Sequence, residues 1–235
     1  MIISSSNVVP AGTLSTAFGG VVDNIKTNLG GAVWNPDSTD PEFTWVGTAP
    51  NITYVAGIVS GFTSVTIRIT GGPTVTQALT LNGCFFIPLS TAVTFTEIEV
   101  EFVGSGMMVN FAMGSSFSVP NGGEQAGYQR IPLQDTRVFS SSVDRAAIPV
   151  AQSVVREPRT ATLNIPNMTF TFATTTWDSF RNFALGEGFF YVLEVDDNPL
   201  HSYMAYQPAF IGPVAHASTR SLVRAGVTFR AYHGG

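Results

Sequence analysis

Charged residues are scarce in this sequence. They make up 11% of the 235 residues, whereas about 25% is usual for a soluble protein. Hydrophobic residues make up 44%, so an intrinsically disordered chain and a coiled coil are both excluded as the main structure. The length allows one large β domain or two small ones.

Cysteine and long hydrophobic runs are also missing. Cys84 is the only cysteine, which excludes intrachain disulfides and a cysteine-based zinc site. The longest apolar stretches, 84–87 and 188–193, are far shorter than the ~20 residues that cross a bilayer. The first residues have neither the basic head nor the apolar run of a secretory signal. We therefore expect a protein that is made in the cytoplasm and does not insert into membranes.

Basic residues are few and unevenly distributed. Lys26 is the only lysine, and the net charge is −5. Residues 1–129 contain Lys26 and Arg68 against eight acidic residues, whereas residues 130–235 contain nine arginines against eight acidic residues. Neither part has the concentrated basic face of a nucleic-acid-binding protein. The low charge favours a surface that is covered by other protein. A compositional bias of the source genome explains the low charge equally well.

Most of the sequence alternates between apolar and polar residues with a period of two. This pattern is typical of antiparallel strands with one buried face. It is clearest in three strands, at 64–70, 97–102 and 222–231. Their predicted buried residues are Val65, Ile67 and Ile69 in the first strand, Ile98, Val100 and Phe102 in the second, and Val223, Ala225, Val227, Phe229 and Ala231 in the third.

A tight turn is predicted at Asn82-Gly83. This pair follows the apolar run 78–81 and precedes the apolar run 85–89. Because Asn-Gly fits the type I′ turn of a two-residue hairpin, we expect the two runs to pair with each other.

One segment has the pattern of a helix, from about 176 to 185. Thr175 and Asp178 have the spacing of a capping box at its start. Gly186 is placed to end it. The residues that we expect to anchor the helix on a sheet fall on one face at helical spacing, and they are Trp177, Phe180 and Ala184.

These elements predict an all-β fold of two antiparallel β-sandwich units. Residues 21–112 form the first, jelly-roll-like unit, and residues 137–235 form the second unit, which contains the helix. The stretch 113–136 is rich in glycine and proline and has little periodicity, so we expect a linker loop there. Residues 1–20 are small and polar and predict a flexible or extended N-terminal arm.

The histidines form no recognisable catalytic motif. They are His201, His216 and His233, and the sequence has no phosphate loop, nucleophile elbow or His-Glu-x-x-His pair. His201 follows Asp196 and Asp197, which allows an Asp–His pair of a hydrolase, but a turn followed by a partly exposed strand residue is the simpler interpretation. We expect no enzymatic activity and no cofactor.

Three carboxylates share one face of a predicted strand. Glu97, Glu99 and Glu101 lie about 7 Å apart along it, at the rise of a strand. Calcium accepts such oxygen ligands, but the sequence lacks the loop spacing of a calcium site. We expect a solvated face without a metal, or a surface that repels polyanions inside a channel.

Three arginines of the last strand have the same parity. Arg220, Arg224 and Arg230 therefore share a face if no bulge intervenes. Two interpretations of this face are open. The arginines contact acidic residues of a neighbouring chain, or they form a solvated face with intramolecular salt bridges.

From Asn28 onward, the order of features resembles the minor tail proteins of long-tailed bacteriophages, the family of ring-forming distal tail or tail-tip proteins. In the first half the likeness is carried by Ala-Val-Trp-Asn-Pro at 32–36 and by the strand at 64–70. In the second half it is carried by the segments 109–117 and 159–165, the helix with Trp177 and Phe180, the bulky strand 189–195 and the Asp-Asn-Pro turn that follows.

The resemblance implies a structural virion protein of the phage tail. Its second unit would be a tail-tube-like sandwich. The chain would form a homo-oligomeric, hexameric ring that connects the tail-tube protein to the hub, the fibres or the baseplate. DNA would pass through the ring without specific binding, Arg220, Arg224 and Arg230 would lie at interfaces, and Glu97, Glu99 and Glu101 would face the lumen or solvent.

A carbohydrate-binding module is the alternative interpretation. Residues 20–105 resemble jelly-roll sugar-binding modules, which would attach the protein to a host surface. Trp45, Tyr54 and Phe62 could form a sugar-binding platform if they are exposed. Aromatic residues in β sandwiches belong to the core more often than to such platforms.

Overall fold

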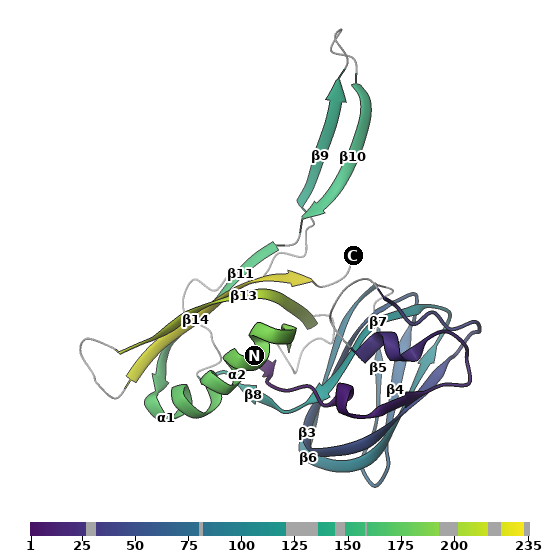
Figure 1. Cartoon of the computed structure of the whole chain (residues 1–235), viewed down its shortest axis with the longest axis horizontal. Coiled ribbons are helices and arrows are strands. Elements are labelled where there is room, and N and C mark those ends of the chain that lie inside the picture. Colours follow the sequence, from purple (N-terminus) through teal and green to yellow (C-terminus); the bar gives the residue numbers. More distant parts are fainter. Residues whose placement is uncertain are drawn as a thin grey trace.

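Two β units lie side by side along the longest axis of the molecule (Figure 1). The computed structural model describes residues 1–26, 32–79, 82–120, 136–143, 149–157, 159–192, 202–215 and 222–232. The first unit contains η1 (Val9–Ala11), β2 (Thr13–Ser15), η2 (Val22–Lys26), β3 (Glu42–Ser60), β4 (Ser64–Ile69), β5 (Thr74–Ala78), β6 (Asn82–Val103) and β7 (Met107–Gly114).

The second unit is a six-stranded antiparallel sheet with one helix against a face. Its strands are β1 (Ile2–Ser4), β8 (Ser116–Ser118), β11 (Arg159–Thr169), β12 (Phe189–Val192), β13 (Ser202–Ala215) and β14 (Leu222–Tyr232). Its helix is continuous through α1 (Phe170–Phe172), the π-helical turn η4 (Ala173–Trp177) and α2 (Asp178–Glu187). The predicted all-β fold of two antiparallel units with one helix is confirmed. β9 (Thr136–Val143) and β10 (Pro149–Glu157) form a separate two-stranded sheet.

Two long strands turn a corner and build both layers of the first unit. β3 and β6 pair from Glu42 opposite Glu101 to Ser60 opposite Asn82, with register shifts between Val46 and Tyr54. Such irregularities bend a strand, which lets one strand contribute to two packed layers. The first half of β3 pairs with β2 and the second half with β7, while β4 pairs with the last part of β6.

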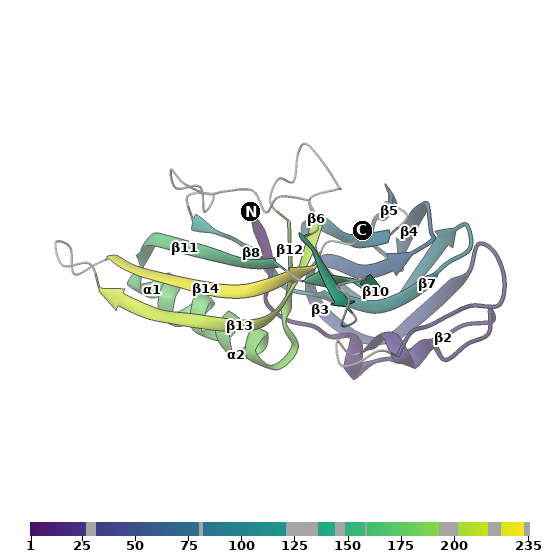
Figure 2. The ribbon, with the colours of Figure 1, turned by 90° about the horizontal axis from the view of Figure 1, so that it is seen from above.

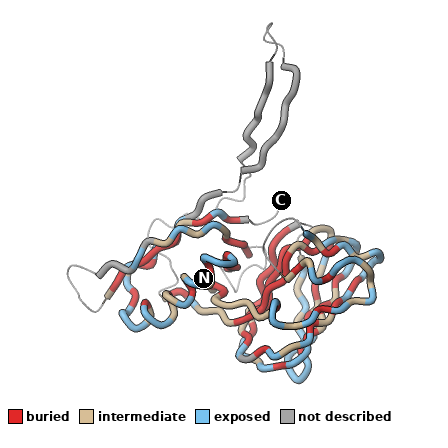
Figure 3. Tube along the Cα trace, viewed as in Figure 1, coloured by how far each residue is buried: buried red, intermediate tan, exposed pale blue. Residues whose placement is uncertain are grey.

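The core of the first unit is dense in aromatic side chains. Phe62 stacks on Phe102 with ring centroids 4.4 Å apart, and Phe43 meets Trp34 and Phe111 edge to face at 5.4 and 5.0 Å. Aromatic pairs of these geometries add favourable energy beyond the area that they bury. The alternation predicted for β4 and for the end of β6 is confirmed, because the residues named for the core in both strands are buried (Figure 3).

The strand order of the second sheet is β11-β14-β13-β12-β1-β8. The helix lies along one face of it (Figure 2). Trp177 and Phe180 are fully buried between helix and sheet, so their predicted role as anchors is confirmed. The alternation predicted for β14 is confirmed as well, because its five apolar residues face the helix.

The helix begins six residues earlier than the sequence predicts. Thr169 caps it, because its hydroxyl accepts a 3.2 Å hydrogen bond from the main-chain nitrogen of Phe172. The predicted capping box at Thr175 is wrong, since Thr175 lies inside the helix and its hydroxyl donates to the carbonyl of Thr171 at 2.8 Å. The run of threonines hides the helix from sequence inspection, because β-branched residues favour strands.

The helix also ends later than predicted. Gly186 lies within α2, and the chain leaves the helix at Gly188, which has a φ of 74°. A Cβ atom at Gly188 would lie 2.5 Å from the carbonyl oxygen of Ala205. Gly188 therefore supplies the conformation and the close approach that the turn from helix to β12 requires.

The predicted hairpin at Asn82-Gly83 is wrong. Both residues belong to β6 and pair with the end of β3, whereas β5 pairs with β4 through Ala78 opposite Ser64. Ala78 of the first run and residues of the second run therefore pair with different strands. Long-range pairing prevails here because it buries both faces of β6, with Phe85 in the first core and Phe86 against the second unit.

The N-terminal segment differs from the expected arm. β1 lies between β12 and β8 in the second sheet, and Ile3 is fully buried there. The segment that follows runs beside β7, where the main-chain nitrogen of Ser5 donates to the carbonyl of Ser115 and that of Val8 to Met113. The second unit therefore includes residues from the beginning of the chain.

The connection between the two units is much shorter than the linker loop that we expect at 113–136. β7 ends at Gly114 in the first unit, and β8 begins at Ser116 in the second sheet. Residues 121–135 of the expected loop lie outside the described residues.

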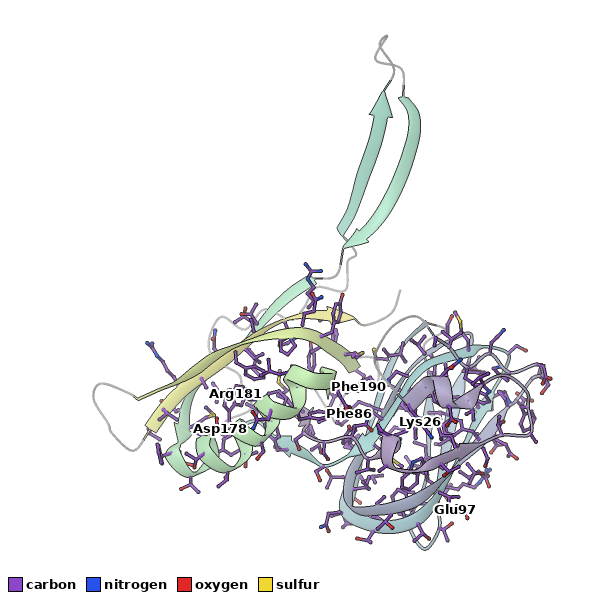
Figure 4. All side chains as sticks on the ribbon, in the orientation of Figure 1. Lys26, Phe86, Glu97, Asp178, Arg181 and Phe190 are labelled. Atoms are coloured by element: carbon purple, nitrogen blue, oxygen red, sulfur yellow. The ribbon has the colours of Figure 1, made fainter. Side chains whose placement is uncertain are left out.

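A third hydrophobic core joins the two units. Phe86 of the first unit and Phe190 of the second lie together in it (Figure 4), with Tyr54 and Cys84 from the first unit and Met204 from the second. The layer formed by the second half of β3 and the first half of β6 is therefore buried on both faces, which fixes the units against each other.

Candidate functional site

The predicted aromatic platform does not form. Trp45, Tyr54 and Phe62 are all fully buried. The indole of Trp45 donates a 3.1 Å hydrogen bond to the carbonyl of Val9, and Phe62 belongs to the aromatic core. The packing of these rings excludes a role in surface binding.

The three glutamates lie on the outer face of the first unit. Glu97 is exposed, and Glu99 and Glu101 are partly exposed (Figure 4 labels Glu97). The guanidinium of Arg68 lies 2.5 Å from a carboxylate oxygen of Glu99 and 2.5 Å from one of Glu101. The hydrogen bond with Glu99 raises the pKa of the Arg68 guanidinium most, and the hydrogen bond with Glu101 adds to this shift. Among the residues that the structure describes, no group of three His, Cys, Asp or Glu side chains could hold a metal ion.

Two of the three predicted interface arginines can be located. Arg224 and Arg230 are exposed and lie on the face of β14 opposite the helix, whereas Arg220 lies outside the described residues. Burial raises the pKa of the nearby Tyr206 hydroxyl, and the charge of Arg230 partly opposes this shift. A role of these arginines in subunit contacts stays a prediction.

The hydrolase hypothesis rests on residues outside the described part of the chain. His201, His216 and His233 lie there, as do Asp196 and Asp197. Within the described residues, no helix is long and apolar enough to cross a membrane.

Two loops of the first unit are hydrogen-bonded to each other. They comprise residues 16–20 and 34–37, and we call them the double loop. The main-chain nitrogen of Asp37 donates a 2.9 Å hydrogen bond to the carbonyl of Phe18. The indole of Trp34 donates a 2.9 Å hydrogen bond to the carbonyl of Gly19. These bonds hold Phe18 and Asp37 next to each other.

The double loop is also fixed to the sheet below it. The hydroxyl of Thr16 donates a 2.6 Å hydrogen bond to the carbonyl of Glu42 and accepts a 3.1 Å bond from the nitrogen of Phe18. Gly19 has a φ of 69°, and a Cβ atom there would lie 2.4 Å from a carboxylate oxygen of Asp37. Only glycine at this position leaves room for the carboxylate of Asp37.

Phe18 differs from every other described aromatic residue of the first unit. Its side chain is partly exposed, whereas each of the other aromatic side chains between residues 1 and 114 that the structure describes is buried. Asp37, whose main-chain nitrogen bonds the carbonyl of Phe18, is exposed as well. A partly exposed aromatic ring can contact the C–H face of a polar ring-shaped ligand, and an exposed carboxylate on a neighbouring loop can accept hydrogen bonds from the hydroxyl groups of that ligand.

Sequence inspection missed this pair because its residues are 19 positions apart and belong to no strand or helix. One signal was available. Phe18 is a single aromatic residue within a run of small residues, followed directly by Gly19-Gly20, and an aromatic residue beside such a turn is more exposed than one in an alternating strand.

No protein-family model and no curated protein matches this chain. Several solved structures are similar to part of it. The family 32 carbohydrate-binding module of Streptococcus pneumoniae EndoD is 14% identical, with a TM-score of 0.39, and the match covers 46% of this chain and 98% of the module. The family 32 module of C. perfringens NanJ in complex with galactose is 8% identical, with a TM-score of 0.41, and the match covers 50% of this chain and 100% of the module.

A fucose-binding module of Streptococcus pneumoniae, SpX-3, is similar at 9% identity and a TM-score of 0.36, over 47% of this chain and 98% of the module. With identities and TM-scores this low, the functions of these modules are not transferred to the present chain.

The interpretation as a phage tail protein requires correction. The similar solved structures are carbohydrate-binding modules and not phage tail proteins. The description of the chain as a virion protein of the tail tip that forms an oligomeric ring is therefore withdrawn. The apolar and turn patterns that carried the resemblance are common to many β-sandwich proteins, because they reflect strand alternation and tight turns.

Proposed function

We propose that the first unit is a carbohydrate-binding β-sandwich module with its binding site at the double loop. The observation that carries the proposal is the main-chain hydrogen bond that makes Phe18, a partly exposed aromatic residue, and the exposed residue Asp37 neighbours. A sugar presents an apolar C–H face and a rim of hydroxyl groups. The ring of Phe18 fits the first feature, and the carboxylate fits the second.

Rigidity of the double loop supports the same function. Hydrogen bonds from Trp34 and Thr16 fix the loop around Phe18, and Gly19 leaves room for Asp37. A preformed site loses little conformational entropy when it binds a ligand.

A glycan array followed by titration calorimetry tests the proposal. We expect the unmodified protein to bind one class of glycan. Phe18→Ala should weaken this binding at least tenfold, which corresponds to about 1.4 kcal/mol. Asp37→Asn keeps the shape of the side chain but removes its charge, so it should weaken the hydrogen bonds to hydroxyl groups.

Val21→Ala is the matched control. Val21 lies three residues from Phe18 and is 62% exposed, so this variant should bind like the unmodified protein. Thermal melting of each variant shows whether it is folded. An array without binding, or binding that neither Phe18→Ala nor Asp37→Asn weakens, would contradict the proposal.

A further inference from the structure

The second sheet has a polar outer face, on the side opposite the helix (Figure 2). β14 runs between β11 and β13 there, and Thr162 of β11 lies opposite Thr228 while Tyr206 of β13 lies opposite Arg230. We call this surface the arginine face. Its residues are Thr162, Asn164, Tyr206, Arg224, Thr228 and Arg230.

The two arginines of this face are unpaired cations. Neither Arg224 nor Arg230 forms an ion pair with a residue that the structure describes, and both are exposed. Lys26 and Arg68, the basic residues of the first unit, are by contrast both held in ion pairs by neighbouring carboxylates. The carboxylates that the structure describes in the second unit belong to the helix. The arginine face therefore attracts negative charge.

A β-bulge interrupts the ladder beside Arg230. The register of β13 shifts between Tyr206 and Ala209, and Gln207 is exposed with a φ of 50°. Such a φ is uncommon in glutamine, and strained bulges recur next to binding sites. The core between the units ends here, since Met204 belongs to it and Tyr206 is partly exposed. The bulge thus lies where the sheet becomes uncovered, next to an unpaired guanidinium.

The polar groups of the arginine face can all donate hydrogen bonds. A guanidinium only donates, and its planar fork fits a carboxylate. Burial raises the pKa of Tyr206, so its hydroxyl stays protonated beside Arg230. The hydroxyls of Thr162 and Thr228 share one 3.1 Å hydrogen bond, which leaves one hydroxyl hydrogen for a ligand. These groups suit a ligand with carboxylates and further oxygen acceptors.

The spacing of the arginines favours a sparsely charged polymer. Arg224 and Arg230 are six positions apart on one strand, which corresponds to ~20 Å at the rise of a strand. Double-stranded DNA carries roughly twelve phosphates over this length, far more than two guanidiniums neutralise. A polysaccharide with uronic acids at only some of its rings carries fewer charges. The hydroxyls of its other rings fit Thr228, which lies between the arginines.

We propose that the arginine face binds an acidic polysaccharide, a chain of sugar rings of which some carry carboxylates. Arg230 and Tyr206 hold one carboxylate, Arg224 holds another, and the hydroxyl of Thr228 contacts a ring between them. The choice of a polysaccharide rests on the proposed function, whereas the site lies on the other unit. Because Asp37 adds negative charge to the double loop, the two sites take different sugars.

Titration calorimetry with hyaluronate, in which every second ring carries a carboxylate, tests this proposal. The matched ligand is the same polymer with its carboxylates reduced to alcohols. We expect hyaluronate to bind at about 0.05 M salt, to bind at least tenfold more weakly at about 0.5 M salt because of screening, and the reduced polymer not to bind. Equal binding of the two polymers, or binding of neither, would overturn the proposal.

Substitutions locate the site. Arg224→Gln/Arg230→Gln should weaken hyaluronate binding at least tenfold, and thermal melting shows whether this variant is folded. Arg181→Gln is the control, because it removes one positive charge on the helix, and it should bind like the unmodified protein. Binding that the double variant retains would overturn the proposal, as would equal losses in the double variant and in Arg181→Gln.

Phe18→Ala separates this proposal from the function proposed for the first unit. Hyaluronate binding should survive Phe18→Ala, and glycan binding at the double loop should survive Arg224→Gln/Arg230→Gln. Loss of hyaluronate binding in Phe18→Ala would place the acidic ligand at the double loop and overturn the arginine face as its site.

Two other occupants of the arginine face are also tested. Tighter binding of an oligothymidylate than of hyaluronate would overturn the proposal in favour of a nucleic acid. Sedimentation velocity without ligand should show the 25.0 kDa mass of one chain. A larger mass that Arg224→Gln/Arg230→Gln abolishes would mean that a second copy covers the face, and would overturn the proposal.

Discussion

The hydroxyl of Tyr54 donates a 2.7 Å hydrogen bond to the main-chain carbonyl of Ser6. Tyr54 is fully buried in the core between the units, where its ring stacks on Phe86 with centroids 5.1 Å apart. This bond fastens the N-terminal segment to the first unit at the same place where the two units meet.

Tyr54→Phe should change the response of stability to alkaline pH. Burial raises the pKa of Tyr54 above its ordinary value, an effect that the side-chain hydrogen bond with Ser4 partly opposes. The folded chain therefore keeps a proton that the unfolded chain loses, so this contribution to stability is complete below about pH 10 and declines as pH rises further.

At pH 8 we expect Tyr54→Phe to lower the free energy of unfolding by about 1–3 kcal/mol, since the partly buried carbonyl of Ser6 loses its donor. Above pH 10 the difference between the variant and the unmodified protein should become smaller. Denaturant unfolding at both pH values measures it. A difference that stays the same at both values would mean that Tyr54 does not resist ionisation.

Ile3→Ala should be strongly destabilising although it changes the third residue of the chain. Ile3 is fully buried in the second core, and truncation of a buried isoleucine costs about 2–5 kcal/mol. Val21→Ala, at a residue that is 62% exposed, should change the unfolding free energy by no more than about 0.5 kcal/mol. Equal effects of the two substitutions in urea unfolding would contradict the placement of β1 in the second sheet.

Trp177→Ala should lower the free energy of unfolding by about 3–5 kcal/mol, the range for removal of a large buried aromatic side chain. Trp177→Phe should cost clearly less. The indole nitrogen of Trp177 is buried and has no hydrogen-bond partner in the described part of the chain, so phenylalanine removes no bond and keeps most of the ring. Thermal melting distinguishes the two variants, and an unchanged melting temperature for Trp177→Ala would contradict the helix packing.

Two glycines at the end of the helix should respond to alanine in opposite directions. Gly186→Ala should stabilise the protein by about 0.5–1 kcal/mol, because Gly186 is helical and a Cβ atom there would meet nothing within 4 Å. Gly188→Ala should cost at least about 1–3 kcal/mol, because of its positive φ and the carbonyl of Ala205. Chemical denaturation of both variants tests where the helix ends.

Strands with one buried face were predictable from the sequence, and strands with two buried faces were not. β4 alternates because one of its faces meets solvent. The second half of β3 packs Val55 into the first core and Tyr54 and Ala56 into the core between the units. This stretch is apolar throughout, so neither its length nor its partner can be inferred from periodicity.

The candidate site was beyond sequence inspection for a different reason. Phe18 and Asp37 are brought together by hydrogen bonds of Trp34 and Thr16 with main-chain carbonyls. Such bonds depend on where the loops end in three dimensions, and residue types alone do not specify this. β1 has only three residues, too few for any period to be recognised.

The position of β1 has a consequence for biosynthesis. Ile3 pairs with Tyr191, which follows it by 188 residues. At translation rates of about 5–20 residues per second, roughly 10–40 s pass before its partner is made. The first sandwich can fold on the ribosome during this interval, while the apolar strand β1 has not yet paired with β12. The second sheet forms only when nearly all of the chain has been synthesised, so its assembly is slow and exposed to aggregation, as for other folds dominated by long-range pairing.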